Sequence, residues 1–172
     1  MPTDCISFRD TAYVSKLICD YVEKRPELEP LYHQFPSLEN FKAQLEAKQS
    51  EFNSEKRSVL VTALTDQYKP FRPSELTVNA IQSLGDENTF TVTTGHQLNL
   101  LGGPLYFLYK IISTINLAKE LTNKYPKNKF VPIFWMASED HDFEEINHFN
   151  FQNKRFQWTQ KYFWGCRSSI HF

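Results

Sequence analysis

Apolar residues recur at helical spacing through most of the first half of the chain. Between residues 13 and 22 they occur every three or four positions behind Asp10 or Thr11, two candidate N-caps, and Pro26 ends the pattern. The same spacing predicts three more helices, at 38–45 behind Ser37, at 59–68 and at 76–84. We therefore expect residues 10–84 to form helices joined by turns.

In the second half of the chain the pattern changes to that of a strand, a helix and a strand. Residues 89–94 (TFTVTT) are β-branched and aromatic, as is typical of strands. The apolar stripe over 105–121 is too broad for a surface helix, so we expect a mostly buried helix with Pro104 in its first turn. Residues 130–137 (FVPIFWMA) are continuously apolar, the pattern of a parallel strand covered on both faces. Together these elements predict a βαβ unit.

Length and composition favour a single domain, or one domain and part of another. Among 172 residues, 19 Lys and Arg stand against 20 Asp and Glu, so the chain lacks the basic excess that drives nucleic-acid binding. No segment resembles a signal peptide or the ~18–20 apolar residues of a membrane span, and the three cysteines show no CxxC spacing. We expect a cytoplasmic α/β protein that binds neither nucleic acid nor membrane, with a helical segment at 1–88 and a core at 89–160.

Ligands of open α/β sheets bind beyond the carboxyl ends of the strands, where two unusual segments of this chain fall. The first is GHQLNLLGGP (95–104), which contains three of the five glycines. Its glycines permit close backbone approach, and the start of the next helix favours a phosphate or carboxylate. The candidate cofactor-binding residues of this loop are Gly95, His96, Gln97, Gly102 and Gly103. Alternatively, the glycines only turn the chain and the polar side chains only satisfy loop backbone.

Lys110 belongs with this loop as a further candidate cofactor-binding residue. It follows Gly103 by seven residues and Tyr106 by four, so all three share a face of the predicted helix. Helical side chains lean toward the N-terminus, which would bring the ammonium group back toward a bound anion. The alternative is an ordinary solvated lysine.

The second segment, SEDHDFEEINH (138–148), places five acids within seven positions directly after the apolar run. Such crowded carboxylates repel one another unless a cation, a substrate or a helix N-terminus offsets them. We expect catalysis here, with His141 first, because histidine can deprotonate an amine near neutral pH. The other candidate catalytic residues are Glu139, Asp140, Asp142 and, from the first segment, His96. Alternatively, the acids complement a helix dipole with His141 as a cap. A metal held by His141, Glu145 and His148 is not predicted, because HEXXH is absent.

The two segments should lie together. Parallel strands joined by a crossover helix place Gly95 and Ser138 at the same edge of the sheet. We therefore predict that the glycine-containing loop and the acidic segment line one cleft.

These segments resemble the N-terminal part of the BshC family, the cysteine-adding enzymes of bacillithiol biosynthesis. The likeness is carried by TVTTGHQLNLLGGPLYFLYKIISTINLAKEL (91–121) and FVPIFWMASEDHDFEEINHFNF (130–151), and DCIS (4–7) agrees. It implies a Rossmann-like core related to nucleotidyltransferases, and the ligation of cysteine to the amine of glucosaminyl malate. It further implies ATP as cofactor, with the loop and Lys110 near its phosphates and residues 139–142 near the amine or the cysteine.

The resemblance covers residues 1 to about 160. Family members are several times longer, and residues 161–172 depart from the family pattern, so we expect a truncated N-terminal fragment with an incomplete core. The coiled coil through which full-length relatives are expected to form homodimers would be missing. The alternative to an enzyme is a non-catalytic remnant that binds at most a small anion or nucleotide.

Overall fold

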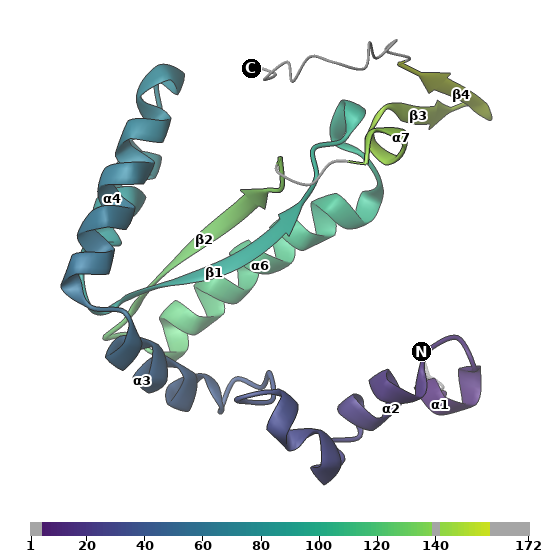
Figure 1. Cartoon of the computed structure of the whole chain (residues 1–172), viewed down its shortest axis with the longest axis horizontal. Coiled ribbons are helices and arrows are strands. Elements are labelled where there is room, and N and C mark those ends of the chain that lie inside the picture. The colour runs from purple at the N-terminus through teal and green to yellow at the C-terminus, as the bar shows by residue number, and fades with distance from the viewer. Residues whose placement is uncertain (1–4, 139–141, 159–172) are drawn as a thin grey trace, which may run out of the picture. The chain divides into compact units, whose positions relative to one another are not determined.

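The computed structural model describes residues 5–138 and 142–158 (Figure 1). The chain divides into two compact units, Met1–Glu87 and Asn88–Phe172. Within the described ranges the first unit is purely helical and the second contains all the strands. No helix in these ranges is both long enough and apolar enough to cross a membrane.

The first unit follows the predicted helical pattern, with shifted starts for two helices. Its elements are α1 (Phe8–Thr11), α2 (Lys16–Val22), the 3₁₀ helix η1 (Pro26–Leu31), α3 (Phe41–Glu51), α4 (Ser54–Tyr68), the 3₁₀ helix η2 (Lys69–Phe71) and α5 (Glu75–Ser83). The predicted N-cap at Asp10 or Thr11 is wrong. Ala12 adopts a left-handed conformation that separates α1 from α2, and the Ser15 side chain accepts the Ile18 N–H as the N-cap of α2.

The helix predicted behind Ser37 also begins later than expected. Ser37 lies in a turn, where its carbonyl accepts the Asn40 N–H, and α3 starts at Phe41. The two later helices, α4 and α5, are confirmed. Asn53 and Ser74 cap their N-termini with side-chain oxygens, the capping that polar residues commonly supply at this position.

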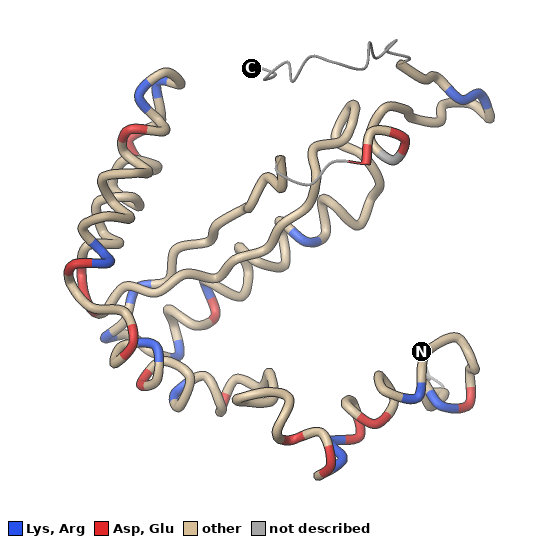
Figure 2. The backbone as a smooth tube through the Cα atoms, viewed as in Figure 1, with Lys and Arg blue, Asp and Glu red and all other residues tan. Residues whose placement is uncertain are grey.

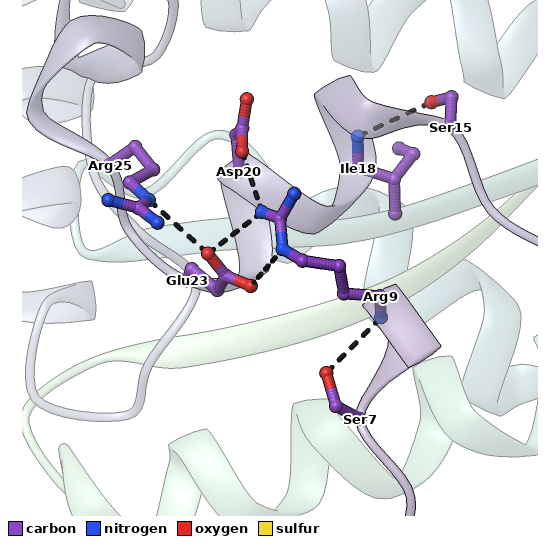
Figure 3. Close-up of polar contacts among 7 residues, drawn as sticks. All are labelled: Ser7, Arg9, Ser15, Ile18, Asp20, Glu23 and Arg25. Carbon is purple, nitrogen blue, oxygen red and sulfur yellow. Dashed lines mark hydrogen bonds and ion pairs between the residues drawn. The ribbon is translucent and has the colours of Figure 1, made fainter. Parts of the chain in front are cut away.

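A surface ion-pair network joins α1 to α2 (Figure 3). Arg9 Nη2 lies 2.8 Å from Asp20 Oδ1 and 2.9 Å from Glu23 Oε2, and Arg25 Nε lies 3.2 Å from the same Glu23 oxygen. The hydrogen bonds from Arg9 lower the pKa of Glu23. The network therefore holds at neutral pH and is lost as the pH falls through that lowered pKa. Because its members are exposed, its contribution to stability is small.

Arg57 of α4 is a buried charge of the first unit, with 5% of its surface exposed. Its Nη1 donates to the Leu84 carbonyl at 3.0 Å and its Nη2 to the Glu87 carbonyl at 3.2 Å. The guanidinium carbon also lies 5.3 Å from the centre of the Phe52 ring. Arg57 thus joins α4 by hydrogen bonds to carbonyl groups at and beyond the C-terminal end of α5. A cation is favoured there because this end of the helix dipole is negative.

Replacing Arg57 with methionine should loosen this unit. Methionine keeps an apolar stem but removes two charge-assisted hydrogen bonds, so we expect the free energy of opening α4 and α5 to fall by about 2–3 kcal/mol. Hydrogen exchange of the α4 and α5 amides measures this directly. Lys42→Met, on the exposed surface of α3, is the control. Equal protection in the two variants would show that Arg57 is not needed to hold these helices.

The second unit is built on the predicted βαβ arrangement, which the structure confirms. Strands β1 (Thr89–His96) and β2 (Lys129–Met136) pair in parallel, from Thr89 opposite Lys129 to His96 opposite Met136. The crossover helix α6 (Leu105–Lys124) packs on both strands (Figure 1). The remaining elements are the 3₁₀ helix η3 (Leu100–Gly102), the short helix α7 (Phe143–Ile146), and an antiparallel pair of strands, β3 (His148–Phe151) and β4 (Lys154–Gln157).

The core of this unit lies between α6 and the two strands. Phe90 and Phe130, which are opposite each other in the sheet, are buried, as are Ala118 and Leu121 of α6. Val131 is also buried, but it follows Phe130 in the strand and therefore lies on the opposite face of the sheet. The expectation that α6 is mostly buried is wrong for this chain, since Leu105, Leu108 and Tyr109 are 65%, 52% and 61% exposed. A sheet of two strands covers only one side of a helix, so the rest of the broad apolar stripe remains at the surface. At the far end of β2, Trp135 is likewise exposed, so this strand is not covered throughout.

Candidate functional site

The two segments singled out in the sequence meet at the carboxyl end of the β1–β2 sheet. Strand β1 runs two residues further than predicted, so Gly95 and His96 belong to the strand rather than to the loop. The His96 carbonyl accepts the Ala137 N–H at 3.2 Å. Beyond the strands, the side-chain oxygen of Gln97 accepts the Asp142 N–H at 3.0 Å. This hydrogen bond joins residues 45 positions apart and confirms that both segments reach the same edge.

Among the described residues of this edge, His96 has a side chain with several contacts. Its Nδ1 lies 2.8 Å from the Gln97 carbonyl oxygen and its Nε2 lies 2.9 Å from the Tyr106 hydroxyl at the start of α6. The half-buried ring also packs against Phe107, with 5.6 Å between ring centres. Asn99 approaches the same corner, where its amide nitrogen donates to the Gln97 carbonyl at 3.1 Å. The imidazole is therefore held by contacts on both ring nitrogens and by a neighbouring aromatic ring.

Lys110 brings the positive charge to this region. No Asp, Glu, Lys or Arg lies between Glu87 and Lys110, so β1 and the following loop are uncharged (Figure 2). The ammonium group reaches back along α6, as predicted, and donates to the Gly95 carbonyl at 3.2 Å. It also lies 5.9 Å from the centre of the Tyr106 ring. Among the described residues no carboxylate pairs with it.

The paired glycines have a structural role in the turn before α6. The N–H groups of Gly102 and Gly103 donate to the carbonyls of Asn99 and Leu100 within η3, and both glycines have positive φ. Pro104 occupies the N-cap position of α6 rather than its first turn, and it has no N–H. The amides without an intrahelical acceptor therefore begin at Leu105, five residues before Lys110.

Substitutions of the two glycines should separate backbone strain from direct contact. An added Cβ at Gly103 would lie 2.5 Å from Asn99 Cβ, whereas at Gly102 no atom lies within 4 Å of it. Gly102→Ala should cost about 1–2 kcal/mol through its positive φ alone. Gly103→Ala carries that cost and also displaces Asn99, so we expect a larger loss of stability and shifted His96 ring resonances. Thermal unfolding and NMR measure both, and indistinguishable variants would contradict this account of the turn.

The acidic segment is only partly described. Glu139, Asp140 and His141, three of the predicted catalytic residues, lie outside the described residues. Asp142 is the N-cap of α7, with its side chain accepting the Glu144 N–H at 3.0 Å. His148 Nδ1 lies 3.0 Å from the Glu144 carbonyl oxygen. No group of three potential metal ligands comes together within the described ranges.

Sequence reasoning did not include Tyr106 and Asn99 among the candidate site residues. The sequence pattern places Tyr106 beside Lys110 on one helix face, and the structure shows that its hydroxyl is the partner of His96. Its position could have indicated this contact, because Tyr106 lies one helical turn before Lys110 and therefore closer to the sheet edge. Asn99 gave no such signal, because its contact depends on the left-handed turn at Leu101 and on Gly103.

Comparison with known proteins identifies these segments. The family model described as "Bacillithiol biosynthesis BshC, N-terminal Rossmann-like domain" matches residues 1–169. A Flavobacterium psychrophilum protein named "Putative cysteine ligase BshC" is 63% identical over 160 residues, covering 92% of this chain and 30% of the relative.

More distant relatives carry the same printed name. The Cytophaga hutchinsonii protein is 42% identical over 153 residues, covering 89% of this chain and 29% of its own length. The Bacillus cereus protein of strain AH820 is 38% identical over 145 residues, covering 83% and 26%. The chain thus spans about 30% of the length of the curated relatives it matches. With the parallel βαβ unit and a match over nearly its whole length, the chain belongs to the BshC family, within the N-terminal Rossmann-like domain.

Proposed function

We propose that this chain supplies part of the active site of a BshC-type ligase that joins the carboxylate of cysteine to the amine of glucosaminyl malate. The proposed site is the carboxyl end of β1 and β2, with Lys110 and His96 as its cation and its base. Gly95, Gln97, Gly102 and Gly103 form the backbone around it, and Asp142 joins the acidic segment to it. Glu139, Asp140 and His141 remain the candidate residues of that segment.

The observation that carries this proposal is the hydrogen bond from the Asp142 N–H to the Gln97 side chain. It joins the two segments by which the chain resembles the family. Ligands of open α/β sheets bind at this edge, so two family-specific segments that meet there are well placed to form a site.

The chemistry of an amide ligase matches these side chains. The reaction removes one oxygen from the cysteine carboxylate, and ATP supplies the activating phosphoryl or adenylyl group that carries this oxygen away. The Lys110 ammonium can stabilise negative charge on a carboxylate or phosphate at the start of α6, together with the amides that begin at Leu105. His96, whose ring nitrogens are both held by hydrogen bonds, can take the proton that the amine loses on attack.

A hybrid enzyme tests the proposed function. In it, residues 1–158 of this chain replace the aligned region of the Flavobacterium psychrophilum relative, a substitution favoured by their 63% identity. We expect the purified hybrid, like the relative, to form the cysteinyl amide from cysteine and glucosaminyl malate only when ATP is present, as measured by mass spectrometry.

The outcomes separate the parts of the proposal. A folded hybrid that makes no product while the relative does would favour the non-catalytic alternative for this chain. If neither protein makes the amide, the proposed reaction is wrong. Product formation without any nucleotide would instead reject ATP as the cofactor and leave the ligation in place.

A further inference from the structure

The contact between His96 and Tyr106 has a defined polarity. A backbone carbonyl oxygen can only accept a hydrogen bond, and the Gln97 carbonyl lies 2.8 Å from His96 Nδ1. Nδ1 must therefore carry the proton in the neutral ring. Nε2 is then an acceptor, and the Tyr106 hydroxyl at 2.9 Å donates to it.

The opposite tautomer conflicts with the geometry around Nδ1. Its lone pair would face the Gln97 carbonyl oxygen at 2.8 Å, which is repulsive. The Asn99 amide nitrogen lies 3.2 Å from Nδ1, but it also lies 3.1 Å from the Gln97 oxygen, so it has a better acceptor. Both donors, Nδ1–H and the Asn99 amide, converge on one carbonyl, and this arrangement sets the direction of the Tyr106 hydrogen bond.

The two side chains differ in their access to solvent. His96 is half-buried against Phe107, which packs in turn on Phe134 of β2 with 5.1 Å between ring centres. Tyr106 is 51% exposed. A molecule approaching this edge thus has readier access to the tyrosine, whose oxygen can still accept hydrogen bonds while its proton points at Nε2.

We propose that Tyr106 is a catalytic residue of the ligation, acting as a proton relay between the substrate amine and His96; this inference rests on the proposed function. As the amine nitrogen attacks the activated carboxyl carbon, its N–H proton passes to the Tyr106 oxygen, and the hydroxyl proton of Tyr106 passes to His96 Nε2. The tyrosine ends neutral and the imidazole ends as a cation.

The geometry accommodates both states of this relay without rearrangement. The protonated ring still donates from Nδ1 to the Gln97 carbonyl, and its new Nε2–H donates to the Tyr106 oxygen. Lys110, 5.9 Å from the Tyr106 ring centre and one turn further along α6, places the anion beside the relay. The activated carboxyl group held by Lys110 would thereby lie next to the Tyr106 oxygen, which accepts the proton of the amine.

The direction of the hydrogen bond can be measured on this chain without any substrate. With nitrogen-15 histidine and His96→Gln to assign the signals, alkaline spectra should show Nδ1 protonated and Nε2 unprotonated. In Tyr106→Phe, the Nε2 resonance should move toward the value of a ring nitrogen that accepts no hydrogen bond. A protonated Nε2 in the neutral ring, or an Nε2 signal unmoved by Tyr106→Phe, would overturn the proposal.

The catalytic role is tested in the hybrid enzyme. Tyr106→Phe should lower kcat about 10²-fold, because the hydroxyl group transfers a proton in the transition state. KM for glucosaminyl malate should change less than about twofold, because the hydroxyl group is not needed to bind the substrate. Tyr109→Phe, three residues along the same helix and 61% exposed, is the matched control and should retain parental activity. Parental kcat in folded Tyr106→Phe overturns the relay while leaving the ligation standing. Absence of product from the unsubstituted hybrid overturns the proposed function and the catalytic role with it, whatever the tautomer.

Discussion

Replacing Lys110 with methionine in the hybrid enzyme is expected to lower kcat/KM about 10²-fold or more. The ammonium group is the first charge after Glu87 in the sequence, it reaches the end of β1, and no described carboxylate neutralises it. Methionine keeps the length and apolar contacts of the stem but removes the charge. Steady-state kinetics with cysteine, glucosaminyl malate and ATP varied in turn measures the loss and shows which of them binds beside Lys110.

Lys119→Met provides the control for this substitution. Lys119 is an exposed lysine in the C-terminal half of the same helix, so its loss changes the net charge and the helix surface equally but leaves the sheet edge intact. It should retain parental activity. If the two variants behave alike, the anion does not bind at the start of α6 and the role assigned to Lys110 is wrong.

Replacing His96 with glutamine should have a larger effect, about 10³-fold on kcat. Glutamine can keep a hydrogen bond to its neighbours but cannot take a proton from the attacking amine. His33→Gln, at a histidine whose Nδ1 contacts Gln44 in the first unit, is the control for loss of an imidazole. Thermal unfolding of both variants must match the parent for the comparison to count. A His96→Gln enzyme with parental kcat would leave His96 as part of the scaffold and shift the role of base to the acidic segment, where His141 remains the first candidate.

The sequence predicted the elements whose signals are local and repeated. The β-branched run after Asn88, the apolar run before Ser138 and the stripe between them predicted the βαβ unit, because two runs of strand length flank a stripe of helix length. Element starts were less well predicted. The capping preferences of Asp10, Thr11 and Ser37 resemble those of Ser15, and only the left-handed residue Ala12 places the break between α1 and α2.

The candidate site was predictable where it depends on topology and not where it depends on side-chain pairing. Parallel strands fix the common edge, so the meeting of Gln97 and Asp142 followed from the order of elements. The broad apolar stripe on α6 correctly marked a helix that packs on a sheet. How far that stripe is buried depends on how many strands lie beside it, which a local pattern does not encode.

The most direct test of the central claim is a crystal structure of the hybrid enzyme with cysteine and glucosaminyl malate bound and nucleotide left out, so that no turnover occurs. The claim is that the edge formed by the ends of β1 and β2 is the active site. We expect a carboxylate of one substrate within hydrogen-bond distance of Lys110 Nζ and the amine of glucosaminyl malate beside the Tyr106 hydroxyl. Both substrates bound elsewhere in the enzyme, with neither side chain in contact with them, would contradict it.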